Sequence, residues 1–286
     1  MSLGSKLLQR LDNTDILNAP GVFDALSALL AEQAGFEAVF LSGSSVAYSQ
    51  LARPDIGLVT MSEMADACAR ITDRVGIPVL VDIDSGFGNA AHAGRTLRVM
   101  EQAGASAVQI EDQLPVKSTD DLKGRPLVDA EVMVDKIKAL TDDRRSSDCL
   151  ISARSDSPAT EPIDQTVDRV GRYCEAGADI VFAEGLTSPD QVAQIVQAAN
   201  GTPVVYNLLH AGREISSSQQ LQALGVSIAL YPGNAVLSAA HAMQAAFAEL
   251  STSLKLPDDG FALSPKQFNE VLGTPDLLNR YKALGS

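Results

Sequence analysis

The chain has 286 residues, a length that suits one large α/β domain, because eight-stranded α/β barrels use about 250 residues. Hydrophobic residues make up 45% of the sequence and charged residues 20%, so the chain can bury a full core and is not a disordered segment. The formal net charge is −14, and such an acidic surface repels phosphate backbones and anionic lipids, so we expect no nucleic acid and no membrane as a partner.

The predicted elements begin behind the N-terminal segment 1–15, which has no apolar run long enough for a signal peptide. A first strand is expected at 15–19. Seven more short apolar segments, each preceded by a helix-like stretch, predict strands that end near residues 41, 82, 111, 154, 184, 207 and 231. The later stretch 235–247 is interrupted by polar residues and predicts a packed helix, not a membrane span.

The order of these elements predicts the fold. Short strands that are apolar throughout are typical of a parallel sheet buried on both faces. Eight βα units in one chain predict the α/β class and a (β/α)8 TIM-type barrel over residues 1–255. A doubly wound sheet would need a Gly-x-Gly-x-x-Gly turn after its first strand, and the sequence has none. Residues 256–286 are expected to form a C-terminal helical tail that packs on the barrel or reaches a neighbouring subunit.

The cysteines Cys68, Cys149 and Cys174 are odd in number and widely spaced. This pattern argues against a disulfide framework and against a zinc site. We interpret them as buried thiols in a reducing compartment, so a cytoplasmic protein is expected.

Acidic residues follow neighbouring predicted strands, where barrel enzymes carry their active sites. Asp82 and Asp84 are two positions apart and point to one face of an extended segment, and Glu111 ends the next strand. Three hard carboxylates with no nearby His or Cys favour Mg²⁺ or Mn²⁺ over zinc. The alternative is that these acids are solvated loop residues, but carboxylates in one pocket repel one another without a cation.

Groups that could hold an anion lie at the same strand ends. The turn 42–45 and the Gly-rich run 84–89 offer backbone N–H groups to a carboxylate or enolate oxygen. Arg154 ends the fifth predicted strand and suits a carboxylate clamp; its alternative role is a salt bridge to Glu184 or another acid.

The loops add further candidates. The segment 112–128 is long and polar, and we interpret it as a lid whose Lys117 and Thr119 approach the substrate, the alternative being an ordinary solvated loop. His210 follows the seventh strand and could enter the site. No lysine falls on a predicted strand, which disfavours a Schiff-base aldolase.

Several motifs occur together in the order of one known group. The chain resembles the isocitrate lyase/phosphoenolpyruvate mutase superfamily from about residue 15 to about residue 250, and the Asp-x-Asp-x-Gly-x-Gly-Asn run is the most specific element. The motifs that carry the resemblance lie at 20–28, 34–43, 54–57, 81–89, 110–113, 153–156 and 230–232.

The resemblance implies a Mg²⁺-dependent enzyme that acts on a small anionic 2-oxo acid through a pyruvate-type enolate. It also implies a homotetramer whose C-terminal helices are exchanged between subunits. The implied roles are metal binding for Asp55, Asp82, Asp84 and Glu111; binding of the substrate carboxylate or oxyanion for Ser42, Gly43 and Ser44; substrate orientation for Arg154; and lining of the site for Glu184, Asn207, His210 and Tyr231.

The segment after the fourth strand departs from the lyase branch, which carries a Lys-Lys/Arg-Cys-Gly-His motif there with the Cys as proton donor. This chain has neither Cys nor His in that segment, and its Lys117-Ser118-Thr119 resembles the Lys-x-Thr of phosphonopyruvate hydrolases. Three hypotheses follow. The first is a C–C lyase, with decarboxylation of an oxaloacetate-like acid as first choice; the others are P–C chemistry on phosphonopyruvate and a catalytically idle 2-oxo acid binder.

Overall fold

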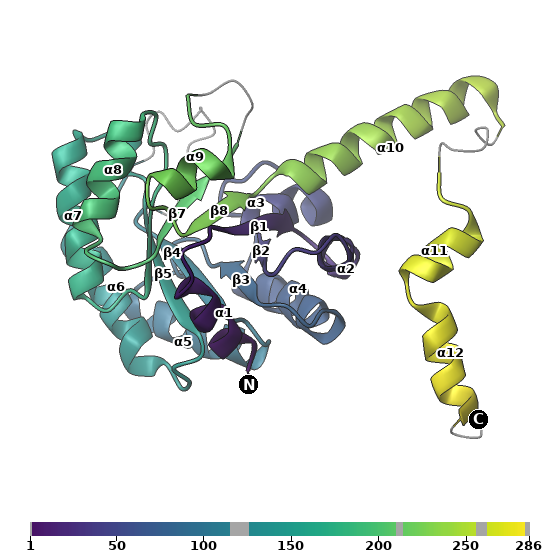
Figure 1. The fold of residues 1–286 in the computed structure, drawn as a ribbon, viewed down its shortest axis with the longest axis horizontal. Helices are drawn as coiled ribbons and strands as arrows, with labels where there is room; N and C mark the ends of the chain where they lie inside the picture. Colours follow the sequence, from purple (N-terminus) through teal and green to yellow (C-terminus); the bar gives the residue numbers. More distant parts are fainter. Residues whose placement is uncertain (1, 115–125, 210–213, 256–261, 284–286) are drawn as a thin grey trace. The chain divides into compact units, whose positions relative to one another are not determined.

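Eight parallel strands close into a barrel (Figure 1), which confirms the predicted (β/α)8 fold. The computed structural model describes residues 2–114, 126–209, 214–255 and 262–283. Neighbouring strands pair in chain order, and β1 pairs with β8 to close the ring. The strands are β1 (Leu17–Val22), β2 (Val39–Leu41), β3 (Val79–Asp82), β4 (Ala107–Glu111), β5 (Leu150–Ser155), β6 (Ile180–Ala183), β7 (Val204–Asn207) and β8 (Ile228–Tyr231).

The first strand begins and ends later than the sequence pattern predicts. Its pairing with β8 begins at Leu17 and reaches Pro20, which lies opposite Tyr231. Gly21 follows, and a Cβ atom there would lie 2.1 Å from the carbonyl oxygen of Pro232. The strand therefore extends to a point where only glycine allows the two backbones to approach.

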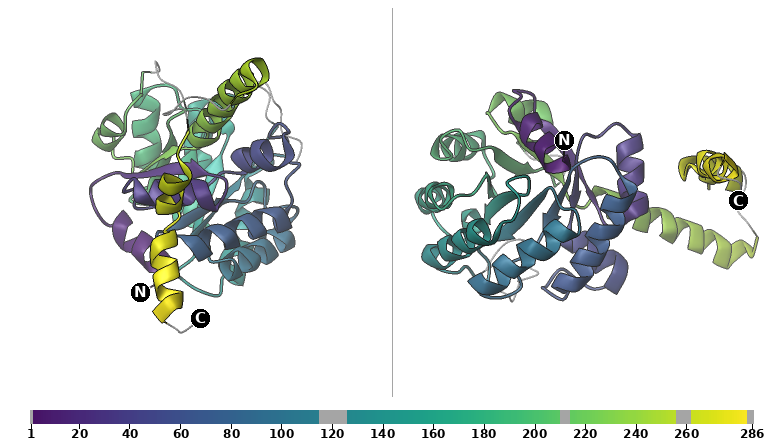
Figure 2. Two further views of the ribbon diagram at one scale, coloured as in Figure 1. Left: turned by 90° about the vertical axis from the view of Figure 1, so that its right-hand side faces the viewer. Right: turned by 90° about the horizontal axis from the view of Figure 1, so that it is seen from below.

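The helices that connect successive strands surround the barrel (Figures 1 and 2). Leu7 of the first helix is fully buried with the residues of the barrel interior, so this helix covers the amino ends of the strands. The helices are α1 (Leu3–Leu11), α2 (Ala25–Gln33), α3 (Gly43–Val46), η1 (Ala47–Leu51), α4 (Met61–Arg74), α5 (Ala90–Gln102), α6 (Ala130–Asp143), η2 (Ser157–Ala159), α7 (Ile163–Glu175), α8 (Pro189–Ala198), α9 (Ser218–Ala223), α10 (Asn234–Ser253), α11 (Pro265–Val271) and α12 (Thr274–Ala283).

The barrel interior changes character along its axis. Towards the amino ends, inward side chains such as Leu80, Ala107 and Leu150 form one apolar cluster. Because side chains alternate between the two faces of a strand, the inward positions further along β4 and β5 are Gln109 and Ser152, and then Glu111 and Arg154. Polar side chains are thus concentrated at the carboxyl ends of the strands, where the sequence predicts the active site. The inward residues of the apolar cluster are Leu17, Ala19, Ala38, Phe40, Leu80, Ala107, Leu150, Ile180, Phe182, Val205, Ile228 and Leu230.

The chain divides into two compact units, Met1–Val236 and Leu237–Ser286. The first contains the barrel. The second contains most of α10 together with α11 and α12. In the part of the chain that the structure describes, no helix is both long and apolar enough to span a membrane.

Candidate active site

The turn after β2 and the end of β3 meet in direct contact. Ser42 caps the short helix α3, where its hydroxyl lies 3.0 Å from that of Ser44. The Gly43 N–H donates to the Asp82 carboxylate at 3.3 Å. A Cβ atom on Gly43 would lie 3.0 Å from the same carboxylate oxygen, so a side chain there would crowd Asp82. The structure therefore brings together four of the residues that the sequence predicts for the site.

The Gly-rich run after β3 has an unusual backbone. Asp84 and Phe87 have positive φ angles of 47° and 56°, a conformation that costs a non-glycine residue free energy. Backbone hydrogen bonds help to hold the run in place: the Gly86 N–H donates to the Ile83 carbonyl at 2.8 Å, and the Glu111 N–H donates to the Asp84 carbonyl at 2.9 Å. The second bond fixes the positions of two predicted metal ligands relative to each other.

Asp84 and Glu111 also share a cavity. Its volume is about 180 Å³, and its walls include Gly57 and Ser85. Asp55 is half-buried two residues before Gly57. Two of the four predicted metal ligands thus line one small cavity, and a third lies close to it in sequence.

Arg154 is surrounded by acids. Its Nε and Nη2 atoms donate to the two Asp156 carboxylate oxygens at 3.0 and 2.8 Å. Its Nη1 lies 3.6 Å from Glu111 Oε2, and its Nη2 lies 3.8 Å from Glu184 Oε2. Burial alone would lower the pKa of Arg154, but the carboxylates of Asp156, Glu111 and Glu184 raise it, and the net shift is upward. The guanidinium is therefore charged and held in one orientation, and its centre lies 5.2 Å from the ring centroid of Phe182.

The residues after β6 to β8 form the other side of the barrel mouth. The Asn207 Nδ2 donates to Glu184 Oε2, while the buried Asn207 Oδ1 has no hydrogen-bond partner. The Tyr231 hydroxyl donates to Asn18 Oδ1 at 2.8 Å. Asn207 therefore has an acceptor that a ligand can use, whereas the Tyr231 hydroxyl is engaged with β1.

Three predicted site residues lie outside the described residues: Lys117, Thr119 and His210. The segments that carry them are 115–125 and 210–213. Their roles stay predictions.

Asp112 is a buried carboxylate that the sequence analysis missed, and it holds in place the residue that binds Arg154. Asp112 is fully buried, and its carboxylate accepts hydrogen bonds from the Ser155 hydroxyl at 2.7 Å, the Tyr173 hydroxyl at 2.8 Å and the Asp156 N–H at 3.0 Å. Burial raises the pKa of Asp112, and the bonds from Ser155 and Asp156 oppose part of that rise. The network fixes the backbone of Asp156, which in turn holds Arg154. Strand alternation indicates that Asp112 points away from the barrel axis, but the sequence does not name its partners.

Gln113 is a second residue that the sequence analysis missed. Its side chain is 1% exposed, and neither its Nε2 nor its Oε1 has a hydrogen-bond partner. The backbone here pairs with Leu127, and the outward neighbour Asp112 implies that Gln113 points to the same side as Glu111. A buried amide without partners is costly, which is typical of a group that awaits a ligand or water.

The donor set of the site fits Mg²⁺. Within the described ranges, no group of three or more His, Cys, Asp or Glu side chains is arranged to hold a metal ion directly. Mg²⁺ commonly uses only one or two protein carboxylates and keeps several waters. Asp82, Asp84 and Glu111 offer only oxygen atoms, and the 180 Å³ cavity at Asp84 and Glu111 leaves room for waters. A parallel barrel with carboxylates and one clamped arginine at the carboxyl ends of its strands defines the class: an α/β-barrel enzyme.

The sequence comparisons identify the family. The family model described as phosphoenolpyruvate phosphomutase (PEP mutase) matches residues 8–251. The chain is 36% identical over 279 residues to the 2,3-dimethylmalate lyase of Eubacterium barkeri, covering 96% of this chain and 95% of that protein. It is 42% identical over 230 residues to the 2-methylisocitrate lyase of Aeropyrum pernix, covering 80% and 73% of the two chains. The protein belongs to the PEP mutase/isocitrate lyase superfamily of enzymes, which confirms the resemblance found in its motifs.

Solved structures agree with this assignment. A 2,3-dimethylmalate lyase superposes with a TM-score of 0.93 at 30% identity, over 100% of this chain and 96% of the other. An oxaloacetate acetylhydrolase with the inhibitor 3,3-difluorooxalacetate gives 0.91 at 26% identity, over 99% and 97%. A phosphonopyruvate hydrolase bound to oxalate and Mg²⁺ gives 0.86 at 30% identity, over 98% of each chain.

Proposed function

We propose that this enzyme cleaves a C–C bond next to a 2-oxo acid in a Mg²⁺-dependent reaction, and that decarboxylation of an oxaloacetate-like acid is the first-choice reaction. The observation that carries the proposal is the combination of a carboxylate-lined cavity with a fixed arginine at one end of the barrel. Named relatives include lyases of a substituted malate and a substituted isocitrate and an oxaloacetate acetylhydrolase, which supports a small acid with at least two carboxylates as the substrate.

The proposed roles follow from the positions of the groups. Asp82 would hold Mg²⁺ most directly, and Asp55, Asp84 and Glu111 would hold it partly through water. The ion would supply positive charge where the 2-oxo oxygen becomes negative. The backbone amides at 42–44 would orient the same oxygen or the neighbouring carboxylate, and the guanidinium of Arg154 would bind a carboxylate through its planar fork.

The absence of a thiol at the site favours decarboxylation over cleavage that needs an acid. All three cysteines are accounted for: Cys68 is buried in α4, Cys149 precedes β5 at the amino end of the barrel, and Cys174 lies near the end of α7. A decarboxylation leaves an enolate that can take its proton from water, so it needs no thiol acid.

Phosphonopyruvate is the second candidate substrate. The solved phosphonopyruvate hydrolase is 30% identical to this chain, and the Lys117-Ser118-Thr119 triplet resembles the pattern of such hydrolases. In that reaction Lys117 and Thr119 would face the phosphoryl group. An idle 2-oxo acid binder is disfavoured. Such a protein gains nothing from buried acids, or from the unfavourable positive φ angles of Asp84 and Phe87.

The C-terminal unit is proposed to join neighbouring subunits of a homotetramer. Large apolar side chains are exposed along α10, α11 and α12, and exposed apolar patches of this kind mark interfaces. Light scattering should give a smaller species for Phe247→Glu than for the native chain, and an unchanged tetramer would contradict the exchange. The exposed apolar residues are Leu237, Met243, Phe247, Leu250, Leu254, Leu263, Phe268, Leu272, Leu277, Leu278 and Tyr281.

The test of function is pyruvate release, coupled to lactate dehydrogenase, from oxaloacetate, phosphonopyruvate and 2,3-dimethylmalate in parallel. Each assay is run with Mg²⁺ and with EDTA, and with a no-enzyme control because free Mg²⁺ promotes oxaloacetate decay. Turnover of oxaloacetate that requires both enzyme and metal supports the proposal. Turnover of phosphonopyruvate alone replaces it with P–C chemistry, and turnover of dimethylmalate alone moves the reaction to substituted malates.

A further inference from the structure

One lysine reaches the site from outside the barrel. Lys136 lies on α6, and its side chain is buried at 5% exposure, whereas Lys138 on the same helix is exposed. Burying an ammonium group is costly unless it has a partner. The Lys136 Nζ donates to the backbone carbonyl of Ser85 at 2.7 Å, so the partner lies in the Gly-rich run after β3.

The contact is made directly beside a residue of that run with an unfavourable backbone conformation. Ser85 lies between Asp84, whose φ is 47°, and Gly86, whose φ is 84°. A charged donor forms stronger hydrogen bonds than a neutral one. The bond from Lys136 therefore opposes relaxation of the backbone that carries the Asp84 carboxylate.

Lys136 also faces a buried acid. The Glu111 N–H donates to the carbonyl of Asp84, the residue before Ser85, so Glu111 lies beside the segment that Lys136 contacts. Burial lowers the pKa of Lys136, and the Glu111 carboxylate opposes that shift, so the ammonium lies within electrostatic reach of this carboxylate. Glu111 is itself 2% exposed and lines the same cavity as Asp84 and Ser85. The ammonium thus acts on both walls of the cavity: it is hydrogen-bonded to one and attracted to the carboxylate of the other.

We propose that Lys136 is a positioning residue of the metal site. Its ammonium serves as an internal counter-ion of the metal-free protein: it holds the Ser85 carbonyl and supplies beside Glu111 part of the positive charge that a divalent cation would otherwise supply. This inference rests on the magnesium site of the proposed function.

The charge of Lys136 fixes the sign of the expected effects. Arg154 already offsets part of the Glu111 charge, so loss of Lys136 increases the repulsion between Glu111 and Asp84 in the metal-free protein, and a bound cation removes that increase. The ammonium also repels a cation that is attracted to the same carboxylates. Because the repulsion energy is proportional to charge, a divalent ion is repelled twice as strongly as a monovalent ion at the same distance. Loss of the charge should therefore destabilise the metal-free protein but tighten metal binding, whereas loss of ordinary packing would weaken both.

The test compares Lys136→Met with Lys136→Arg and with Lys138→Met, the exposed control on the same helix. Thermal unfolding is measured in metal-stripped protein and in excess Mg²⁺, and Mn²⁺ binding is measured by calorimetry. Lys136→Met should have a metal-free Tm several degrees below that of the native chain. In excess Mg²⁺, this difference in Tm should shrink by at least half. The variant should also bind Mn²⁺ severalfold more tightly than the native chain. Lys136→Arg and Lys138→Met should resemble the native chain in Mn²⁺ affinity.

The outcomes separate this inference from the proposed function. Mn²⁺ binding by the native chain with equal or weaker binding by Lys136→Met would overturn the counter-ion role and leave the magnesium site standing. No Mn²⁺ binding by the native chain would overturn the site and the inference together. If Lys136→Met does not fold without metal, recovery of folded protein in Mg²⁺ supports the role, and failure in Mg²⁺ overturns it.

Discussion

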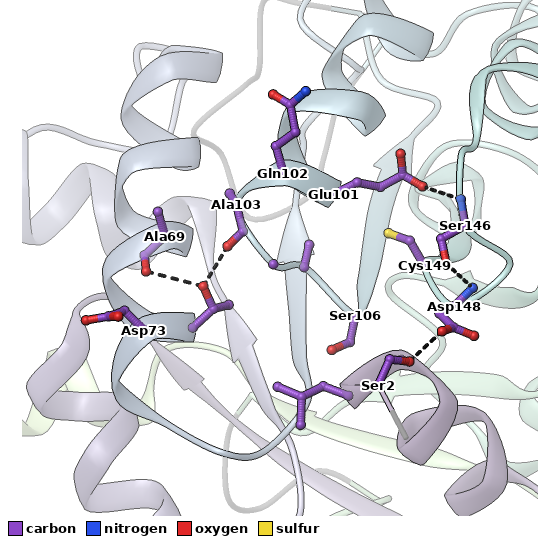
Figure 3. Close-up of a pocket in the computed structure, with 15 residues that line it drawn as sticks. Ser2, Ala69, Asp73, Glu101, Gln102, Ala103, Ser106, Ser146, Asp148 and Cys149 are labelled. Atoms are coloured by element: carbon purple, nitrogen blue, oxygen red, sulfur yellow. Dashed lines mark hydrogen bonds between the residues drawn. The ribbon is translucent and has the colours of Figure 1, made fainter.

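The two ends of the barrel contrast in how their polar groups are used. At the amino end, a cavity of about 560 Å³ is lined by Glu101, Ser146 and Asp148, among others (Figure 3). Glu101 accepts from the Ser146 N–H at 3.1 Å, and Asp148 accepts from the Ser2 hydroxyl at 2.6 Å. The cavity at the carboxyl end is only about 180 Å³, and it is lined by Asp84, Glu111 and strained backbone.

The comparison shows that the candidate active site does not lie in the larger of these two cavities. In the larger cavity, Glu101 and Asp148 already accept hydrogen bonds from nearby hydroxyl and backbone groups. At the carboxyl end, the amide of Gln113 and the Asn207 Oδ1 are buried without partners, and Arg154 is held by acids. Groups left without protein partners at the end of the strands are available for a ligand.

The largest effect should come from removing the Asp82 carboxylate. Asp82→Ala should lower metal-dependent turnover about 1,000-fold, because metal-assisted charge stabilisation is worth several kcal/mol. The matched control is Asp73→Ala, an exposed acid that lines the amino-end cavity and should leave turnover unchanged. Pyruvate release measures both. Equal losses in the two variants would remove the distinction between the two ends.

A smaller loss of turnover is expected when Asp156, which holds Arg154, is changed. Asp156→Asn keeps the size of the side chain, but it removes the charge that holds the Arg154 Nε and Nη2 atoms. The value of kcat/KM should fall about 10- to 100-fold, the range typical of groups that orient a binding residue. The exposed Asp190→Asn on α8 serves as the control. If Asp156→Asn retains native kcat/KM, the ion pair does not position Arg154 for substrate.

The smallest effect is expected at the amino end, in stability and not in turnover. Hydrogen bonds from Ser2 and Ser5 lower the pKa of Asp148 from its ordinary value of 3.8. A lowered pKa means that the ionised carboxylate stabilises the fold above the unfolded pKa, and that this stability is lost as the pH falls through the lower folded pKa. Asp148→Asn should therefore be slightly less stable than the native chain at neutral pH.

Urea unfolding at pH 7 and at pH 3 measures this difference, which should shrink at the lower pH. Pyruvate release by Asp148→Asn should match the native rate at both low and high substrate concentration. A large loss of turnover would show that a change in the amino-end cavity alters the reaction at the candidate active site.

Much of the fold and part of the candidate site could be predicted from the sequence. Eight short apolar segments with helix-like stretches between them predict the barrel, because a parallel strand buried on both faces has a local signature. The same segments place Asp82, Glu111 and Arg154 at strand ends, and strand alternation turns all three inward. Sequence alone thus determined the architecture and the residues at the mouth of the barrel.

Only the tertiary structure decided which groups work together. Lys136 belongs to a helix in the sequence pattern, yet it bonds Ser85, 51 residues away. Tyr173 donates to Asp112 across 61 residues. Arg154 could pair with any of several acids, and its closest contacts are with Asp156. The physical reason is range: strand and helix patterns depend on neighbours a few residues apart, whereas the partner of a buried charge depends on which distant segments the barrel packs together.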